Sequence, residues 1–356
     1  MASKKLLLLI NRPEIGGSQR IFAELMEILP QEGCPVQLAY LFGAPSAESP
    51  ARDDVAYLGF RNIADIRALL RFRAFVRTNG ITHILATLEQ ASIAARLVGW
   101  LAWDLRIVVS EPGMADRKPL FAKLLDIALN VRTDAIVAGS TKVRESLLSY
   151  QPFYARKIPV LLNGTVVPVP PLPHTPEPAY TILAVGRLIW EKGFDRLIEA
   201  FGIFLQETGA DAQLVIVGGG PLADSLKAQA SEASLSSKIR FLGELDFKET
   251  KAWFLRAHCF AISSLSEGAP LVVLEAMANG LPVVSTRVGQ VPETIEDGVS
   301  GIIVAPGSAA ELAAGLVRLY VDEPLRARMA RAGYERVRDH FSFDEHVRAL
   351  RKILGL

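Results

Sequence analysis

The sequence is poor in cysteine and almost neutral in charge. Only Cys34 and Cys259 occur among 356 residues, and no Cys-x-x-Cys motif or cysteine–histidine cluster accompanies them. A disulfide scaffold and a structural zinc site are therefore not expected, and a reducing compartment fits this composition. The formal net charge of +1 gives no general excess of cations for nucleic-acid binding.

Long hydrophobic runs are also missing. The apolar stretch at 6–10 is shorter than the roughly 7–15 residues of a secretory leader core. The stretch at 97–103 lies between Arg96 and Asp104, so it is far shorter than the roughly 20 apolar residues that cross a bilayer. We therefore expect a soluble cytoplasmic protein, with a peripheral position on the inner face of the cytoplasmic membrane as an open alternative.

What the sequence does contain is a regular alternation of short apolar runs and segments of helical period. This alternation is typical of parallel sheets built from βαβ units and covered on both faces. The candidate strands are 6–10, 36–40, 83–87, 106–110, 134–138, 158–162, 181–186, 213–218, 239–243, 259–263, 281–286 and 301–305. The helices expected in the first half are 17–30, 62–78, 90–102, 117–130 and 141–150. The predicted fold class is α/β, with two Rossmann-like doubly wound domains.

Six prolines interrupt this alternation between Pro168 and Pro178. We predict an N-terminal domain over 1–168, a proline-rich linker over 169–178 and a C-terminal domain over 179–340. The final segment, 341–356, is a candidate to pack back on the first domain. The 170 residues before a cut at the linker contain 20 Lys and Arg against 15 Asp and Glu, so they carry about +5, whereas the rest carries about −4.

Much of the positive charge lies in one predicted helix, which contains Arg67, Arg71, Arg73 and Arg77 between apolar residues. Two interpretations stay open at this point. The arginines form a solvated face above the core, or they form a basic amphipathic face that meets an anionic membrane surface or an anionic acceptor.

Two glycine clusters follow candidate strands. Gly16 and Gly17 are expected in the first βα turn, with Arg20 one turn into the helix. Such a turn can hold an anion at a helix N-terminus, but a plain tight turn is equally consistent. The cluster at 218–223 formally satisfies Gly-x-Gly-x-x-Ala. It follows the second strand of its domain without an acidic residue at the required distance, so we do not expect a dehydrogenase. More simply, these glycines keep side chains away from a ligand or from the facing domain.

A third loop places two cations between glycines. Gly186 and Arg187 end the first strand of the second domain, and Lys192 and Gly193 precede a helix. Ligands of open α/β sheets bind at the carboxyl ends of strands. An arginine fork and a mobile lysine at this edge suit a diphosphate, although a solvated loop can also carry such charges.

Two glutamates flank the start of a later helix. Pro270 and Gly280 are a typical first-turn residue and stop signal, so we predict a helix over 270–279. Glu267 lies in the preceding loop, and Glu275 lies inside the helix. Carboxylates separated in this way can accept hydrogen bonds from two sets of hydroxyl groups on one ligand. The alternative for Glu275 is an exposed helix position.

These motifs together resemble the family-4 retaining glycosyltransferases of the GT-B fold, the glycosyl transferases group 1. The matching segments are GRLIWEKGFDRLIEAF, LVIVGGGP, IRFLGEL, SEGAPLVVLE, AMANGLPVVSTRVGQVPETIEDGVSGIIV and HFSF. They cover nearly all of 180–345. The first domain matches only through Gly16-Gly17-x-x-Arg20 and residues 163–165.

The resemblance implies that two domains face a central cleft and bind a nucleoside-diphosphate sugar. Arg187 and Lys192 would neutralise the diphosphate, Glu275 would bind the ribose and Glu267 the donor sugar, so that Arg187, Lys192 and Glu267 are the expected catalytic residues. The other donor-binding positions that the resemblance implies are Gly16, Gly17, Gly186, Leu242, Leu245, Gly268 and Ala269.

The expected reaction is hexosyl transfer with retention of anomeric configuration, through the front-face attack that the family uses. The acceptor would be a glycan or a lipid-linked sugar of the cell envelope, and UDP is expected in preference to GDP. No Asp-x-Asp motif occurs, so neither a metal nor a cofactor is expected, and fixed cations would stabilise the leaving diphosphate. Related classes that stay open are a nucleotide-sugar epimerase, a phosphorylase and a non-catalytic nucleotide-sugar-binding protein.

The first domain departs from the family at one position. Many relatives have a histidine after a first-domain strand near the reacting carbon, where this sequence has Glu111. Glu111 would position an acceptor hydroxyl, with Arg20 as a second acceptor-side candidate, or it would merely cap a helix. His83 lies inside a strand pattern and is expected to be a hydrogen-bonded core residue.

Overall fold

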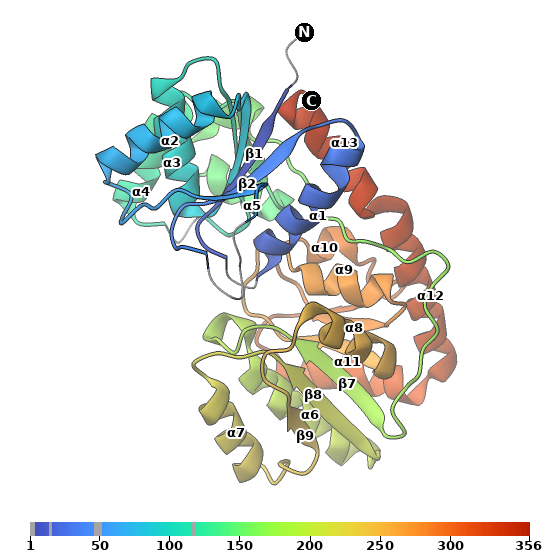
Figure 1. Cartoon of the computed structure of the whole chain (residues 1–356). Coiled ribbons are helices and arrows are strands. Elements are labelled where there is room, and N and C mark those ends of the chain that lie inside the picture. The colour runs from blue at the N-terminus through green and yellow to red at the C-terminus, as the bar shows by residue number, and fades with distance from the viewer. Residues whose placement is uncertain (1–3, 14–15, 46–51, 116–117) are drawn as a thin grey trace. The chain divides into compact units, whose positions relative to one another are not determined.

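The computed structural model describes residues 4–13, 16–45, 52–115 and 118–356. Within these residues, the strands form two parallel six-stranded sheets, one in each of two compact units (Figure 1). Unit 1 comprises Met1–Leu162 and His346–Leu356, and unit 2 comprises Asn163–Glu345. The predicted fold class, two doubly wound α/β domains, is confirmed.

The sheet of unit 1 has the strand order β3-β2-β1-β4-β5-β6. Its strands are β1 (Leu6–Ile10), β2 (Val36–Tyr40), β3 (Val55–Tyr57), β4 (His83–Thr87), β5 (Arg106–Glu111) and β6 (Ala135–Ala138). All five residues of the central β1 are buried, because helices cover both faces of a parallel sheet. This double burial explains why β1 is a continuous apolar run.

The helices of unit 1 divide between these two faces. They are α1 (Gly17–Gln31), α2 (Ile66–Thr78), α3 (Glu89–Leu101), α4 (Leu120–Asn130) and α5 (Thr141–Leu148), with the short 3₁₀ helix η1 (Pro152–Lys157). The connections through α2, α3 and α4 all run in the direction from β3 toward β6. Since parallel crossovers are right-handed, these three helices lie on one face and α1 on the other. Most of the last helix, α13 (Phe343–Leu354), also belongs to unit 1.

The sheet of unit 2 has the order β12-β11-β10-β7-β8-β9. Its strands are β7 (Tyr180–Val185), β8 (Ala212–Val217), β9 (Ile239–Phe241), β10 (Cys259–Ile262), β11 (Val283–Thr286) and β12 (Ile302–Val304). The chain leaves β7 toward β9 and then returns to β10 on the other side of β7. The β7–β10 boundary is therefore the topological switch point, where open α/β sheets bind ligands at the carboxyl ends of their strands.

The helices of unit 2 complete its two outer layers. They are η2 (Trp190–Lys192), α6 (Phe194–Thr208), α7 (Ala223–Glu232), α8 (Phe247–Arg256), α9 (Leu271–Ala278), α10 (Val291–Thr294), α11 (Ala309–Val321) and α12 (Glu323–His340). Aromatic residues of α6, among them Phe201 and Phe204, are fully buried against the sheet. Across the described ranges, no helix combines the length and the apolar character that a membrane crossing needs.

The elements differ from the sequence prediction at a few places. The predicted strand at 158–162 is wrong: only an isolated bridge joins Val160 to Ala138, because Pro159 has no N–H to extend the ladder. The short strand β3 was not predicted. The helix predicted over 270–279 is α9, with Pro270 as its N-cap. Position 117, the predicted start of another helix, lies outside the described residues, and residues 169–178 form neither helix nor strand.

Candidate functional site

The switch point of unit 2 carries an ion pair between two loops. Lys192 is the last residue of η2, which follows β7, and Glu267 lies in the loop that follows β10. The Lys192 ammonium donates a hydrogen bond to Oε1 of Glu267. Both side chains are largely buried, at 22% and 14% exposure. The fold therefore brings together two of the predicted site residues at the edge where this sheet class binds ligands.

Two serines hold this pair in place. Ser264 Oγ donates a hydrogen bond of 2.9 Å to the same Oε1 of Glu267, and Ser263 Oγ donates one of 2.9 Å to the backbone carbonyl of Lys192. Lys192, Glu267 and both serines line a small surface pocket, together with apolar residues of β7 and β10. A positioned ammonium and a positioned carboxylate thus lie side by side at the carboxyl ends of β7 and β10.

A glycine allows the two loops to approach. Gly193 adopts a left-handed conformation with φ of 59°, and a Cβ at this position would lie 2.4 Å from the backbone oxygen of Ser263. Any side chain here would push the Lys192 loop away from the end of β10. The glycine next to the predicted lysine therefore has a packing function that brings Lys192 to Glu267.

The second glycine cluster packs on the same loop. Gly218 has a φ of 136°, and a Cβ at this position would lie 2.0 Å from the backbone oxygen of Gly186. The group that requires a glycine here is thus the backbone after β7, not the ligand or facing domain expected from the sequence. Gly220 likewise packs against the backbone of Leu188, so both glycines of the Gly-x-Gly-x-x-Ala pattern have a packing function that needs no dinucleotide.

The other predicted donor residues lie around this edge without joining the ion pair. The guanidinium of Arg187 is exposed and makes no hydrogen bond or ion pair with the described residues. Glu275 is buried on α9, so its alternative as an exposed helix position is wrong. The half-buried Leu242 and Leu245 lie in the loop after β9, and Gly268 and Ala269 lie between Glu267 and Pro270.

The backbone around Ala269 is tied to neighbouring loops. The side-chain Nδ2 of Asn163 donates a 3.1 Å hydrogen bond to the Ala269 carbonyl, and the backbone N–H of Gln290 donates one of 2.9 Å to the Gly268 carbonyl. These bonds hold the backbone carbonyls of Gly268 and Ala269, which lie in the segment that leads from Glu267 into α9. The segment is therefore positioned at both ends, by Ser264 and by these two contacts.

In unit 1, the predicted glycine pair is exposed and begins a helix. Gly16 is the N-cap of α1 in an extended conformation, and the half-buried Arg20 lies one turn later. His83 is buried in β4, and its Nδ1 is 2.7 Å from the hydroxyl of Thr82. Burial lowers the pKa of His83. This histidine is a hydrogen-bonded core residue, as expected from the sequence.

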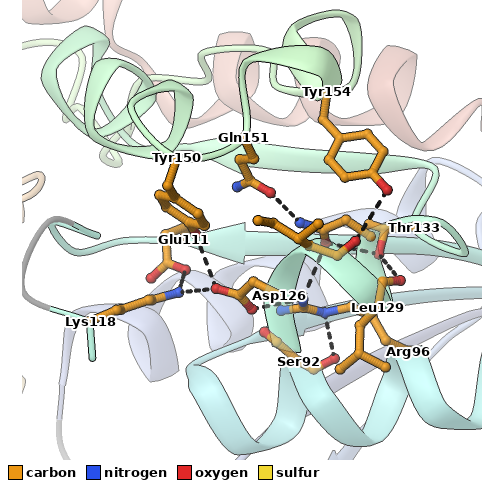
Figure 2. Close-up of polar contacts among 12 residues, drawn as sticks. Ser92, Arg96, Glu111, Lys118, Asp126, Leu129, Thr133, Tyr150, Gln151 and Tyr154 are labelled. Atoms are coloured by element: carbon orange, nitrogen blue, oxygen red, sulfur yellow. Dashed lines mark hydrogen bonds and ion pairs between the residues drawn. The ribbon is translucent and has the colours of Figure 1, made fainter. Parts of the chain in front are cut away.

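Glu111 is the last residue of β5 and caps no helix, since the N-cap of α4 is Pro119. Its carboxylate accepts a hydrogen bond of 2.5 Å from the Lys118 ammonium, and Lys118 also donates one of 3.0 Å to Asp126 on α4 (Figure 2). Asp126 in turn accepts a hydrogen bond of 2.9 Å from Arg96 on α3. The four side chains form a network in which negative and positive charges alternate, and this network starts from Glu111 at the carboxyl end of β5.

Uncharged groups complete this network. Arg96 also donates to Oδ1 of Asn130, and the side-chain Nδ2 of Asn130 donates to Oε1 of Gln151. The hydroxyl of Tyr150 donates to the Asp126 carboxylate (Figure 2). The Asp126 carboxylate thus has three donors, which meets the requirement that a buried charge be paired and hydrogen-bonded.

The network sets different protonation behaviour for its two acids. Burial raises the pKa of Glu111, and the neighbouring Lys118 offsets this rise only in part. Burial would also raise the pKa of Asp126, but Arg96 and Lys118 outweigh it and lower that pKa. For Lys118, the two carboxylates outweigh burial and raise the pKa. As pH falls, Glu111 is therefore the first acid of the cluster to take up a proton.

Sequence reasoning missed most of this cluster. Lys118, Asp126 and Tyr150 were not singled out, and Arg96 was noted only as a charge that interrupts an apolar stretch. A signal was present, because Arg96 and Asp126 are isolated charges within otherwise apolar helical segments. Such charges are rarely buried unless they pair with one another.

Two family models together match most of the chain. The model of the glycosyl transferases group 1 matches residues 173–336, and the model of glycosyltransferase family 4 matches residues 15–169. The lipopolysaccharide core biosynthesis glycosyltransferase LpsE of Rhizobium meliloti is 28% identical over 341 residues, which is 92% of each chain. The amylovoran biosynthesis glycosyltransferase AmsK of Erwinia amylovora is 35% identical over 179 residues, 49% of this chain and 44% of that protein.

A solved structure extends the agreement to the fold. The crystal structure of Anabaena HepE in complex with UDP and glucose covers 99% of both chains with a TM-score of 0.83 at 17% identity. The two sheets described above thus have the GT-B arrangement of strands and helices. Both family models show that the chain belongs to the group 1 glycosyltransferases of family 4.

Proposed function

We propose that this glycosyltransferase moves a hexosyl group from a nucleoside-diphosphate sugar, bound by unit 2, to a glycan or lipid-linked acceptor, bound by unit 1. Transfer proceeds with retention of anomeric configuration and without a metal ion. The observation that carries the proposal is the Lys192–Glu267 pair at the β7–β10 switch point. The assignment of the two predicted domains, 1–168 and 179–340, as acceptor-side and donor-side is part of this proposal; the compact units divide between Leu162 and Asn163, so the proline-rich segment 169–178 belongs to unit 2.

The chemistry of the pair suits a donor sugar. When the glycosidic bond breaks, negative charge develops on the leaving diphosphate, and fixed cations stabilise it. Lys192 and the exposed Arg187 would supply this charge, with Gly186 allowing the phosphates to approach. Glu267 would accept hydrogen bonds from sugar hydroxyls, and the buried Glu275 would do so from the ribose.

Similar proteins support the choice of donor and acceptor. LpsE is named for lipopolysaccharide core biosynthesis, and AmsK for amylovoran biosynthesis. HepE was crystallised with UDP and glucose. We therefore favour UDP over GDP as the donor nucleotide and a cell-envelope polysaccharide or glycolipid as the product, made on the cytoplasmic side.

On unit 1, we propose that Glu111 positions the acceptor hydroxyl. It lies at the carboxyl end of β5 and stays 22% exposed while Lys118 fixes its carboxylate. We propose Arg20 as a second residue that contacts the acceptor, and the Gly16-Gly17 turn as a contact to the donor diphosphate. The arginine face of α2 is the proposed electrostatic contact with an anionic membrane: Arg67, Arg71 and Arg77 are exposed, whereas Arg73 donates to the Leu101 carbonyl.

The test is a donor screen followed by a transfer assay. We expect one UDP-sugar to raise the melting temperature most and to label a component of cell-envelope lipid extracts, with the anomeric configuration of the product matching that of the donor. Epimer formed from the donor without acceptor would favour an epimerase instead. Sugar phosphate formed from glycan and orthophosphate would favour a phosphorylase. Tight donor binding without product in any acceptor pool would favour a binding protein.

A further inference from the structure

The helix α4 of unit 1 has large apolar side chains on its outward face, whereas its buried face combines the polar Asp126 and Asn130 with Ala122 and Leu129. Its buried face carries Asp126 and Asn130, which bind Arg96 of α3 (Figure 2). Its outward face carries Leu120 and Phe121, each 72% exposed. A surface helix of a globular protein normally has the opposite arrangement, with its apolar stripe against the core.

The outward face is apolar along the length of the helix. Leu124 and Leu125 follow Leu120 and Phe121 by one turn and are also exposed. The polar network accounts for the buried face, because Asp126 needs its partners Arg96 and Lys118. Nothing within the described part of the chain covers the outward face. Contiguous apolar surface of this kind marks a site of interaction with another molecule or with a membrane.

The apolar surface continues onto the neighbouring helix end. Trp103, which follows α3, is 70% exposed and forms an edge-to-face pair with Trp100 at a centroid distance of 5.6 Å. Arg132, just after α4, lies over the Trp103 ring and donates to its backbone carbonyl at 2.8 Å, so the tryptophan pair borders the end of α4. Tryptophan rings prefer the boundary between apolar and aqueous phases.

The helix beside this surface adds positive charge, although Asp104, next to Trp103, is exposed and acidic. The helix α2, which packs against α3 on the same face of the sheet, contains four arginines and no acidic residue (Figure 1). Its outward face combines Arg67 and Arg71 with the exposed Ile66 and Leu70. The only acidic residue of α4 is Asp126, which is buried and paired. The surface therefore offers apolar groups and cations together, the combination that binds anionic bilayers.

We propose that the outward face of α4, with Trp100 and Trp103, inserts into the interfacial region of an anionic lipid bilayer. Eleven residues give α4 a length of about 16 Å. A hydrocarbon core is about 30 Å thick, so the helix lies in the interface and does not cross it. This insertion goes beyond the electrostatic contact proposed for α2, because apolar burial persists when salt screens the arginines.

Charge complementarity favours a bilayer over a second copy of the chain. An isologous dimer through this face would bring each patch against itself. Such a dimer would gather the arginines of α2 from both copies at one interface, where the exposed Asp104 next to Trp103 would offset only part of their charge. Anionic lipid headgroups neutralise the same charges.

The experiment measures binding of the full chain to phosphatidylcholine vesicles with and without about 30% phosphatidylglycerol, at about 0.05 M and about 0.5 M salt. Donor and acceptor are absent, so the result is independent of the proposed transfer activity. We expect binding to anionic vesicles that weakens with salt but keeps a measurable component at high salt. Replacing Phe121→Ser together with Leu124→Ser should lower the high-salt partition coefficient roughly tenfold or more.

Two comparison variants separate the contributions. Val321→Ser removes an equally exposed apolar residue from unit 2 and should change nothing. Arg67→Gln with Arg71→Gln should weaken binding at low salt only. The proposal is overturned if the Phe121/Leu124 variant binds anionic vesicles like the parent at high salt, or if the parent binds no vesicles. It is also overturned if light scattering shows a dimer that this variant dissociates, which would assign the face to a second copy.

Discussion

Lys192 and Glu267 are separated by 75 positions in the sequence, yet the ammonium of the first donates a hydrogen bond to the carboxylate of the second. The reversal of strand order between β7 and β10 causes this proximity, because it places the loops after these two strands next to each other. Gly193 then removes the steric obstacle between the loops. The pair is therefore a product of topology and of one backbone conformation.

Replacing Lys192→Ala should lower kcat/KM for transfer by about 10²–10³-fold, since one fixed cation at the developing diphosphate charge is lost. Donor binding by calorimetry and initial transfer rates measure the effect. Lys238→Ala is the matched control, because Lys238 pairs with the exposed Asp211 before the amino-terminal ends of β8 and β9. Parental rates in the Lys192 variant would contradict the assigned role.

Replacing Glu267→Gln should separate nucleotide binding from transfer. The change removes a negative charge beside Lys192, so UDP alone should bind several-fold more tightly. Transfer should nevertheless fall by about 10²-fold, because the donor sugar loses a charged acceptor of hydrogen bonds. Glu232→Gln, at an exposed position of α7, is the control. Equal losses in UDP binding and in transfer would argue for a purely structural role of Glu267.

Replacing Gly218→Ala should destabilise unit 2 by more than about 2 kcal/mol, because the new Cβ would meet the Gly186 oxygen at 2.0 Å. Gly209→Ala is a sharp comparison. Gly209 has a φ of 62°, but a Cβ added there would meet no atom within 4 Å, so only the backbone cost of about 1 kcal/mol applies. Urea denaturation of both variants measures the difference between their free energies of unfolding. Equal values would contradict the prediction and would mean that the loop after β7 moves away from the new Cβ without cost.

The fold could be predicted largely from the sequence, because each buried parallel strand is a short apolar run between helical segments. The apolar run at 158–162 is an exception, because it was predicted as a strand and does not form one. Its composition matches a strand, but Pro159 leaves it with one isolated bridge beside β6. The reverse error is β3, whose three residues are half-buried and too few to give a pattern.

The candidate site was predictable in its residue types and not in its contacts. Lys192 and Glu267 stood out as charges in loops after strands, and the switch point brings them together. The direct ion pair, and the support by Ser263 and Ser264, depend on loop geometry that spacing does not encode. The outward apolar face of α4 also escaped prediction, because amphipathic periodicity does not say which face is buried.

Replacing Arg96→Met should lower the free energy of unfolding by about 3–5 kcal/mol, because Asp126 would stay buried beside fewer partners. The double change Arg96→Met with Asp126→Leu should recover a large part of this loss, since no unpaired buried charge remains. Asp54→Asn is the control, because its partner Arg52 is largely exposed and such pairs contribute little. A single Arg96 variant as stable as the parent would show that the network is solvated.

The free energy of unfolding should fall as the pH is lowered from about 7.5 to 5.5, in part through His346. This residue lies in α13 and is the first residue of that helix that belongs to unit 1. Burial lowers the pKa of His346 below its usual 6.5, although the Leu162 carbonyl, 2.9 Å from Nδ1, opposes the shift. The unfolded chain therefore binds a proton below about pH 6.5 that the folded chain excludes, and protonation favours unfolding. His83 and His258 act in the same direction, because burial lowers their pKa as well. His346→Gln should make the urea midpoint less dependent on pH in this range, whereas the exposed His340→Gln should leave the parental slope. An unchanged slope in the His346 variant would mean that this imidazole titrates alike in both states.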